Sequence, residues 1–203
     1  EYDVVQRTLA QHSMEKVEKF VQEVFWRIYW KGWLEHRPAV WADFVDFDQS
    51  QTSQTHYQQA VRGKTGVDCF DNWVVELQNT NYLHNHARMW FASIWIFTLG
   101  LPWQAGARFF MQHLSDGDAA SNTLGWRWVA GLQTSGKHYL ARAGNIDQFT
   151  NGRFELAQLN ETALPIAASK RYDIMPVGSV TEYKKKYNNC IVLETDLYLS
   201  RKE

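Results

Sequence analysis

Over its first two-thirds, this chain repeats apolar residues at the spacing of an α-helix, and this periodicity limits the possible fold more than any other feature. Ser13 is a suitable N-cap for a long helix that ends near Glu35. Its expected buried stripe comprises Val17, Phe20, Val21, Val24 and Ile28. Further helices are predicted at about 38–47, 68–79, 84–99 and 103–114, while 49–59 is either a loop or an exposed helix.

The pattern loosens after residue 128. We expect a loop at 131–143, a short helix at 145–154 and a short strand at 190–193. From residue 155 onward there is little periodicity, and two prolines, Pro165 and Pro176, interrupt it. The sequence therefore predicts an all-α multi-helix bundle over residues 1–154, followed by an irregular tail, 155–203, whose role it does not indicate.

Composition excludes several classes of protein. The net charge of −1 gives no global basic field for nucleic acid, so any contact with DNA has to be local. No membrane span or signal peptide is evident, so we expect a soluble protein. Two cysteines, Cys69 and Cys190, form neither a disulfide framework nor a four-cysteine metal site, which favours a reducing compartment such as the cytoplasm. The ten Trp, nine Tyr and eleven Phe residues indicate stacking surfaces or electron transfer, or simply an aromatic core.

The segment 116–128 combines acids, an amide and indoles within thirteen residues. Asp116 and Asp118 flank a glycine, so a tight turn can aim both carboxylates at one polar object. If a helix begins at Asp118, Asn122 and Trp126 follow on the same face, whereas Trp128 points elsewhere. This arrangement suits a polar, partly aromatic ligand, although taken alone the two aspartates are more typical of helix caps and solvated turns.

Two other segments repeat the theme. Residues 23–27 offer an acid, an indole and a guanidinium, and in 84–89 the side chains of Asn85, Arg88 and Met89 share one helical face. Plainer interpretations exist here too: Arg88 in a surface ion pair, His84 as a core histidine, His86 on the outer face, and Trp90 and Trp95 as packing residues.

Together these segments resemble the flavin-binding helical domain of the photolyase and cryptochrome family. The family's ExxWR, HNxxRM and DGDxAxNxxGWxW patterns are matched by Glu23–Arg27, His84–Met89 and Asp116–Trp128, in order, with Trp103–Phe110 matching its GxRxF segment. The resemblance runs from about residue 15 to residue 150. It implies a U-shaped FAD inside a helical bundle.

The resemblance also implies roles around that FAD. Asn122 takes the position that hydrogen-bonds flavin N5, where an amide sides with photolyases. Arg88 and Asp116 should pair beside the isoalloxazine, and the cation favours the anionic reduced flavin. Gly117 and Asp118 belong at its polar edge, and Phe110 should pack near the ring.

For the substrate, the resemblance implies light-dependent repair of ultraviolet-damaged DNA, with one electron passing to a flipped-out cyclobutane pyrimidine dimer. Trp26 and Trp128 match the indoles that hold the dimer, and Met89 packs against it. Glu23 and Asn85 match the groups that hydrogen-bond its base edges. The asparagine favours the cyclobutane type over the (6-4) type, which carries a second histidine there. Arg27 matches an arginine that faces DNA or the lesion.

The family's tryptophan chain is incomplete in this sequence. Trp126 and Trp103 match its proximal and middle members, but the distal position is Ala60. Tyr57 and Trp41 are candidates to replace the distal tryptophan; otherwise photoreduction is impaired. Phe20 stands where the family has a tryptophan that contacts FAD.

Two elements of the family that would come before the long helix have no match in this sequence. The family's phosphate-cradling loop, of the form TSxLSPY, and its N-terminal antenna domain are not in this sequence, so we expect a truncated domain with weakened or no FAD binding. Three functions stay open: a repair photolyase, a cryptochrome-like blue-light receptor without repair activity, and a flavin-free helical fragment. Whether the chain is itself an enzyme, and its oligomeric state, are not predicted.

Overall fold

The computed structural model describes residues 1–134, 136–156, 158–168 and 170–176. The chain divides into two compact units, Glu1–Asp173 and Ile174–Glu203, and the fold discussed below is that of the first. All regular structure in the described ranges is helical, apart from a single bridge between Thr134 and Lys137, so the predicted all-α class is confirmed. The helices are α1 Tyr2–Gln11, α2 Met14–Glu35, α3 Pro38–Val45, η1 Gln49–Gln51, α4 Gln54–Val61, α5 Asp68–Thr80, α6 Asn85–Ser93, η2 Ile94–Thr98, α7 Trp103–His113, α8 Ala119–Ala130 and α9 Ala143–Thr150.

Helix ends follow the local signals in the sequence. Ser13 is the N-cap of α2, and Asp118 caps α8 by accepting a hydrogen bond from the Ser121 amide. Gly131, at φ +84°, ends α8 in the left-handed conformation that glycine adopts without strain. The predicted helix 84–99 consists of α6 and a π-helical turn, η2, which shifts the register of the residues beyond Ser93.

The stretch 49–59 forms η1 and most of α4, so of its two predicted alternatives the exposed helix is confirmed. Residues 2–11 form α1, which the periodicity did not predict. His84 was expected in the core but is an exposed N-cap that accepts a hydrogen bond from the His86 amide. Its position one residue before the helix explains this, because an N-cap lies at the solvent-facing end.

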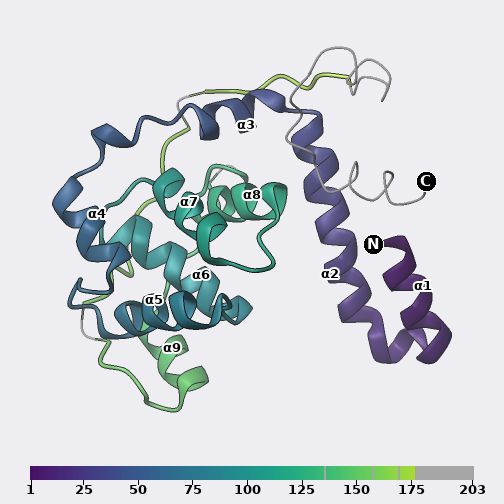
Figure 1. Cartoon of the computed structure of the whole chain (residues 1–203), viewed down its shortest axis with the longest axis horizontal. Coiled ribbons are helices and arrows are strands. Elements are labelled where there is room, and N and C mark those ends of the chain that lie inside the picture. The colour runs from purple at the N-terminus through teal and green to yellow at the C-terminus, as the bar shows by residue number, and fades with distance from the viewer. Residues whose placement is uncertain (135, 157, 169, 177–203) are drawn as a thin grey trace. The chain divides into compact units, whose positions relative to one another are not determined.

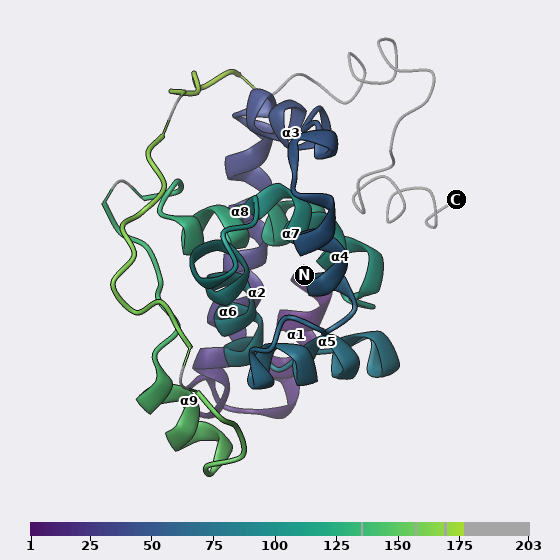
Figure 2. The ribbon, with the colours of Figure 1, turned by 90° about the vertical axis from the view of Figure 1, so that its left-hand side faces the viewer.

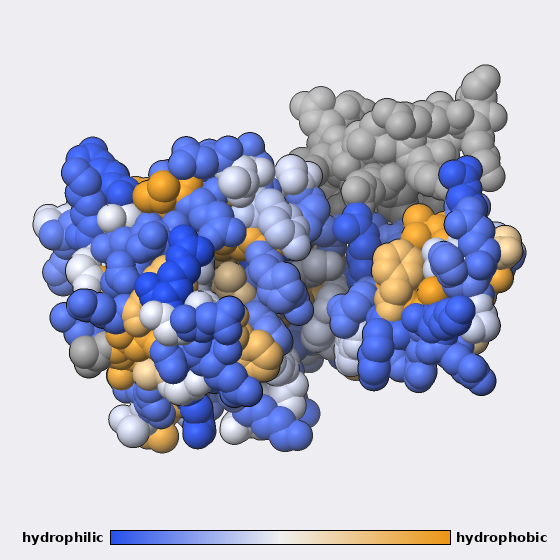
Figure 3. All heavy atoms as spheres, turned by 90° about the horizontal axis from the view of Figure 1, so that it is seen from below, coloured by the Kyte–Doolittle hydropathy of each residue, from blue (hydrophilic) through white to orange (hydrophobic). Residues whose placement is uncertain are grey.

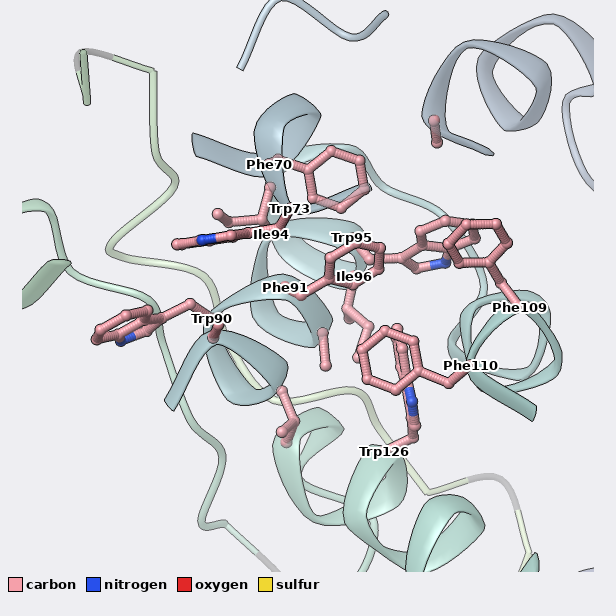
Figure 4. Close-up of a cluster of buried hydrophobic side chains, with 14 of the residues drawn as sticks. Phe70, Trp73, Trp90, Phe91, Ile94, Trp95, Ile96, Phe109, Phe110 and Trp126 are labelled. Carbon is pink, nitrogen blue, oxygen red and sulfur yellow. The ribbon is translucent and has the colours of Figure 1, made fainter. Parts of the chain in front are cut away.

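The interior is strongly aromatic (Figure 4). The α5 residues predicted to point inward, Phe70, Trp73, Val74 and Leu77, are all buried, as are the predicted packing residues Trp90 and Trp95. Helix α8 lies against α7, α2 and α6, and α1 lies along α2 (Figure 1). This arrangement puts three separate stretches of the sequence around α8.

The predicted buried stripe of α2 is wrong for two of its members. Val21 is buried, but Phe20 is 49% and Ile28 is 43% exposed. The helix instead turns the face that carries Trp26 and Trp30 toward α8. Apolar side chains therefore reach the surface in patches (orange in Figure 3), and those on α2 include Phe20 and Ile28.

Arg108 on α7 holds the end of α3. Its Nη2 donates to the carbonyl oxygens of Phe44, Val45 and Phe47, at 3.2, 2.8 and 3.0 Å. The last carbonyls of a helix lack partners within the helix, so a guanidinium placed there satisfies several of them at once. The arginine of the 103–110 segment thus has a structural task.

After α9 the chain runs back past α8 to α3 without regular structure (Figure 2). The amide of Ile166 donates to Ala130 O at 2.9 Å. Lys170 and the Tyr172 hydroxyl both donate to the Asp43 carboxylate, at 3.0 and 2.8 Å. The predicted strand at 190–193 lies outside the described residues. In the part of the chain that the structure describes, no helix is long and apolar enough to cross a membrane.

Candidate functional site

A cavity of about 710 Å³ lies between α2, α6, the end of α7 and α8. Three segments far apart in the sequence meet at its wall, as the resemblance implied. Trp103, predicted as the middle member of the tryptophan chain, is not on the wall; it is buried in the core. The predicted residues that line the cavity are Glu23, Trp26, Arg27, Asn85, Arg88, Met89, Phe110, Asp116, Gly117, Asp118, Asn122, Trp126 and Trp128.

One wall is a single face of α2. Glu23, Trp26, Arg27 and Trp30 recur at helical spacing and all line the cavity. The Trp26 and Trp30 rings stack with centroids 5.7 Å apart, and Tyr29 meets the Trp30 ring edge-on at 5.1 Å. Trp26 and Trp30 thus form an aromatic ridge, and the sequence analysis gave neither Trp30 nor Tyr29 a role in the site. The ridge makes this wall a flat aromatic surface.

The opposite side carries an ion pair. Arg88 Nη2 lies 3.0 Å from Asp116 Oδ2, which is the predicted pairing. Arg88 Nε also donates to Leu83 O at 2.7 Å, and its guanidinium lies 5.3 Å from the centre of the Tyr82 ring. The side chain of Arg88 is 23% exposed. Because three contacts fix the guanidinium, a positive charge is held at this wall before any ligand enters.

Asp118 has two tasks. Its carboxylate caps α8 at the Ser121 amide, 2.9 Å away, and lies 3.6 Å from Arg27 Nη2 and 3.8 Å from Lys31 Nζ. Glu1 bridges the same two cations at 3.0 Å from each. Burial acts to raise the pKa of Glu1, but the hydrogen bonds from Lys31 and Arg27 and the charge of Lys31 outweigh it and leave this pKa lowered.

Arg27, predicted to face DNA or the lesion, is thus on the wall with acidic partners. Lys31 was missed by the sequence reasoning, although its place four residues after Arg27 on α2 was the available signal.

Asn122 presents a fixed amide to the cavity. Its Nδ2 donates to the carbonyl of Ala107 on α7 at 2.8 Å. The orientation of the amide follows from this bond, because a carbonyl accepts only from the nitrogen end. The Oδ1 atom is therefore the end that stays available to accept a hydrogen bond from a ligand.

Two buried polar atoms of cavity-lining residues have no hydrogen-bond partner within the described chain. They are the indole nitrogen of Trp126 and Oε1 of Gln133. Buried polar groups are almost always paired, so a donor and an acceptor left over at one cavity indicate a polar ligand or bound water. Gln133 was not anticipated; it follows the C-cap of α8 by two residues.

Trp126 and Trp128 both reach the cavity, although the sequence placed Trp128 on another face. Trp126 is 3% exposed and makes ring contacts with Phe110, Phe91 and Trp95. Trp128 stacks on Tyr139, with centroids 5.9 Å apart and planes at 28°. Because the cavity wraps around α8, residues on different faces of this helix can both line it.

Comparison with known proteins identifies the class. The profile of the family described as the FAD binding domain of DNA photolyase matches residues 20–163. The chain therefore belongs to this family. Deoxyribodipyrimidine photo-lyases are among its curated relatives: that of Escherichia coli (strain K12) is 34% identical over 128 residues, and that of Streptomyces griseus is 38% identical over 121 residues.

The matched regions are only part of those proteins. The alignments cover 59% and 58% of this chain and 26% of each relative, so the chain spans about a quarter of their length. Two solved structures share the fold at 23% identity. A cryptochrome of Synechocystis sp. PCC6803 has a TM-score of 0.62 over 74% of this chain and 32% of its own. An archaeal photolyase from Sulfolobus tokodaii with two FAD molecules has a TM-score of 0.58 over 66% and 32%.

The cavity fits the FAD for which the family is described. Its volume lies within the range of about 300–1,000 Å³ that is usual for ligand sites. Its wall offers a fixed cation in Arg88, a fixed acceptor in Asn122, the ring of Phe110 and the two buried polar atoms without partners. A flat heterocycle with donors and acceptors around its rim matches this set. Phe20, which stands where the family has a FAD-contacting tryptophan, lies off the cavity wall and is half exposed.

Proposed function

We propose that this chain is the flavin-binding portion of a light-dependent DNA-repair enzyme of the cyclobutane-dimer type. The observation that carries this proposal is that one cavity combines the charged and amide groups suited to FAD with aromatic and polar groups suited to an unpaired base. Family membership supports the binding of a flavin, and the cavity residues of α2 and α6 support the binding of a pyrimidine dimer.

The proposed cofactor-holding residues come from the ends of three helices. Arg88, paired with Asp116, favours a negative charge on the neighbouring ring and so the electron-rich form of a flavin. Asn122 orients the ring through its Oδ1 atom, with Gly117 and Asp118 at the polar edge and Phe110 on its plane. Bound FAD would supply a blue-light-absorbing group that gives and takes single electrons.

The proposed substrate residues combine aromatic surfaces for stacking with polar groups for hydrogen bonding. Trp26 and Trp128 offer flat surfaces to the two linked pyrimidines of a dimer extruded from the duplex, and Met89 fills the space beside them. Glu23 and Asn85 supply an acceptor and an amide for the Watson–Crick edges of the two pyrimidines. One electron delivered to the dimer splits its two C–C bonds and then returns, so the residues have only to bind, orient and exclude water. The cytoplasm is the proposed location of the chain, as the low cysteine content favours.

The test uses the full chain reconstituted with FAD, reduced, and mixed with an ultraviolet-irradiated thymine oligonucleotide under blue light. Loss of dimers, measured by chromatography, is expected only in the light. Trp26→Ala should weaken binding of the irradiated oligonucleotide about 10-fold or more, because stacking on an aromatic side chain contributes about 1–3 kcal/mol per base.

Phe25→Ala is the matched control. Phe25 is the neighbouring aromatic residue on α2, is similarly exposed (55% against 51% for Trp26), and is off the cavity wall. A chain that retains flavin but reverses no dimers removes the repair proposal and leaves a light receptor. A chain that gains no flavin removes both.

A further inference from the structure

Three oxidisable rings run in contact from the cavity to the surface of α4. Trp126, on the cavity wall, meets Trp95 edge-on with centroids 6.1 Å apart (Figure 4). Trp95 meets Tyr57 edge-on at 6.0 Å. Trp95 is fully buried and Tyr57 is half-buried, so the series leads outward. Indole and phenol are the aromatic side chains that lose an electron at accessible potentials, whereas the phenylalanines around them do not.

The first contact depends on a glycine. A Cβ atom on Gly106 of α7 would lie 2.3 Å from Cη2 of Trp126 and 3.0 Å from Cε2 of Trp95. Both indoles therefore occupy space that any other residue would fill. The contact between them is a built feature of the α7–α8 packing, since glycine in the middle of a helix is otherwise unfavourable.

Trp95 is suited to pass a charge on rather than keep it. Its indole nitrogen donates to Pro102 O at 2.9 Å. A carbonyl oxygen is not a base, so oxidised Trp95 has no group in this hydrogen bond that can take its proton. An indole radical that keeps its proton is a stronger oxidant than a neutral phenoxyl radical, and the electron is therefore drawn from the neighbouring phenol.

Tyr57 can lose its proton. It lies on α4, one turn before the fully buried Ala60, and is partly exposed. No described residue makes a hydrogen bond with its hydroxyl, which leaves water as the acceptor. Loss of an electron together with loss of the phenol proton to water ends the series with a neutral radical at the surface.

The alternative outward path through Trp103 is disfavoured. The guanidinium of Arg127 lies 5.8 Å from the centre of the Trp103 ring, and a nearby cation makes a ring harder to oxidise. Phe44 stacks on Trp103 at 5.8 Å and separates it from Trp41, which packs on Phe44 at 5.3 Å. A phenylalanine thus interrupts the path to the surface.

We propose that Trp126, Trp95 and Tyr57 form the path along which single electrons reach the oxidised flavin in the cavity of this chain, with Tyr57 as the terminal donor. The inference rests on the proposed function, because the oxidant is an oxidised flavin excited by light in the cavity. One electron moves from Trp126 to that oxidant, one from Trp95 to Trp126 and one from Tyr57 to Trp95. The Tyr57 proton goes to water, and the net change is a one-electron reduction at the cavity and a neutral phenoxyl radical at residue 57.

The test is electron paramagnetic resonance of the FAD-loaded full chain, frozen under blue light, with ring-deuterated tyrosine to identify a tyrosyl signal. The unsubstituted chain should give a tyrosyl radical. Tyr57→Phe keeps the ring on Trp95 but removes the hydroxyl, and should lower the tyrosyl yield at least tenfold. Trp95→Phe should do the same, while Trp41→Phe, off the path, should not.

The outcomes separate the two proposals. Flavin binding is read first from the visible absorption spectrum, and its absence overturns both the path and the proposed function. If flavin binds and Tyr57→Phe gives an unchanged tyrosyl signal, only the path is wrong. A radical that survives in Trp95→Phe but is lost in Trp103→Phe also overturns it, in favour of the Trp103 route.

Discussion

Gly106 should resist replacement by alanine, although alanine is the better helix former. It lies in the interior of α7, where its missing side chain admits the Trp126 indole. The new Cβ atom would stand 2.3 and 2.5 Å from Cη2 and Cζ3 of that indole, whereas ordinary contact begins at 3.4 Å. The ring would have to withdraw by roughly 1 Å in an interior that packs as densely as an organic crystal.

The magnitude follows from two opposing effects. Helix propensity favours alanine by about 1 kcal/mol. Overpacking costs about 1–3 kcal/mol, and occasionally more. Trp126 is also held by Phe110 and Phe91, with ring centroids 5.1 and 6.4 Å away, so we expect the upper part of that range. The free energy of unfolding should fall by about 1–2 kcal/mol, and Tm by about 2–4 °C per kcal/mol for a chain of this size.

The assay is urea unfolding followed by circular dichroism, with Gly32→Ala as the matched control. Gly32 is also inside a helix, α2, but a Cβ atom there meets nothing within 4 Å. Gly32→Ala should therefore raise the free energy of unfolding by up to about 1 kcal/mol. If Gly106→Ala is stabilised as much as Gly32→Ala, the close packing of Trp126 on α7 is refuted.

Three further predictions concern other parts of the described chain. Burial raises the pKa of the Cys69 thiol to about 12, so at about pH 8 in a Cys190→Ser chain iodoacetamide should modify Cys69 roughly a thousandfold more slowly than a free thiol until urea unfolds the chain. Arg108→Ala removes the donor to two α3 carbonyls and to Phe47 O just beyond the helix, and should lower the free energy of unfolding in urea by about 1.5–3 kcal/mol; an unchanged midpoint would contradict this capping role. Hydrogen bonds from Lys170 and Tyr172 hold the pKa of Asp43 below its usual value near 3.8, so their stabilisation is present above that value and is lost as the pH falls below it. Amide hydrogen exchange at 170–173, corrected for its intrinsic rate, should thus be faster at about pH 3 than at about pH 6, and the difference should vanish in Asp43→Asn.

Local signals were enough to predict most helices. Ser13 and Asp118 each precede the start of a helix, and the Asp118 side chain caps its helix with a hydrogen bond. Gly100, at φ +65°, follows the end of η2 in the left-handed conformation. Such signals act over a few residues and can be read from the sequence. The inward face of α5 was also predictable because one side of that helix is uniformly apolar. The π-helical turn η2 was not, since no local residue type announces it.

The orientation of α2 could not be predicted from its own residues. Its apolar stripe and its Trp26 face could each have faced the bundle, and only contact with α8 determines that the Trp26 face lines the cavity. Most cavity residues were predicted from the resemblance of three motifs to the photolyase and cryptochrome family, and helical spacing added only which side chains within a motif share a face. Partnerships across helices, such as Trp126 with Trp95 or Asn122 with Ala107, depend on how α7 and α8 meet.

The hydrogen bond from Asn122 to the Ala107 carbonyl requires a side chain at position 122 that can donate a proton. An ionised aspartate in the same place would set an oxygen against the Ala107 carbonyl where an amide hydrogen now lies. Only the protonated acid could donate there, so the fold would raise the pKa of such an aspartate and lose stability as the pH rose through it. Urea unfolding of Asn122→Asp across the acidic range would reveal this dependence. Because the amide of Asn122 carries no ionisable proton, the contact between α7 and α8 keeps the same stability as the pH changes.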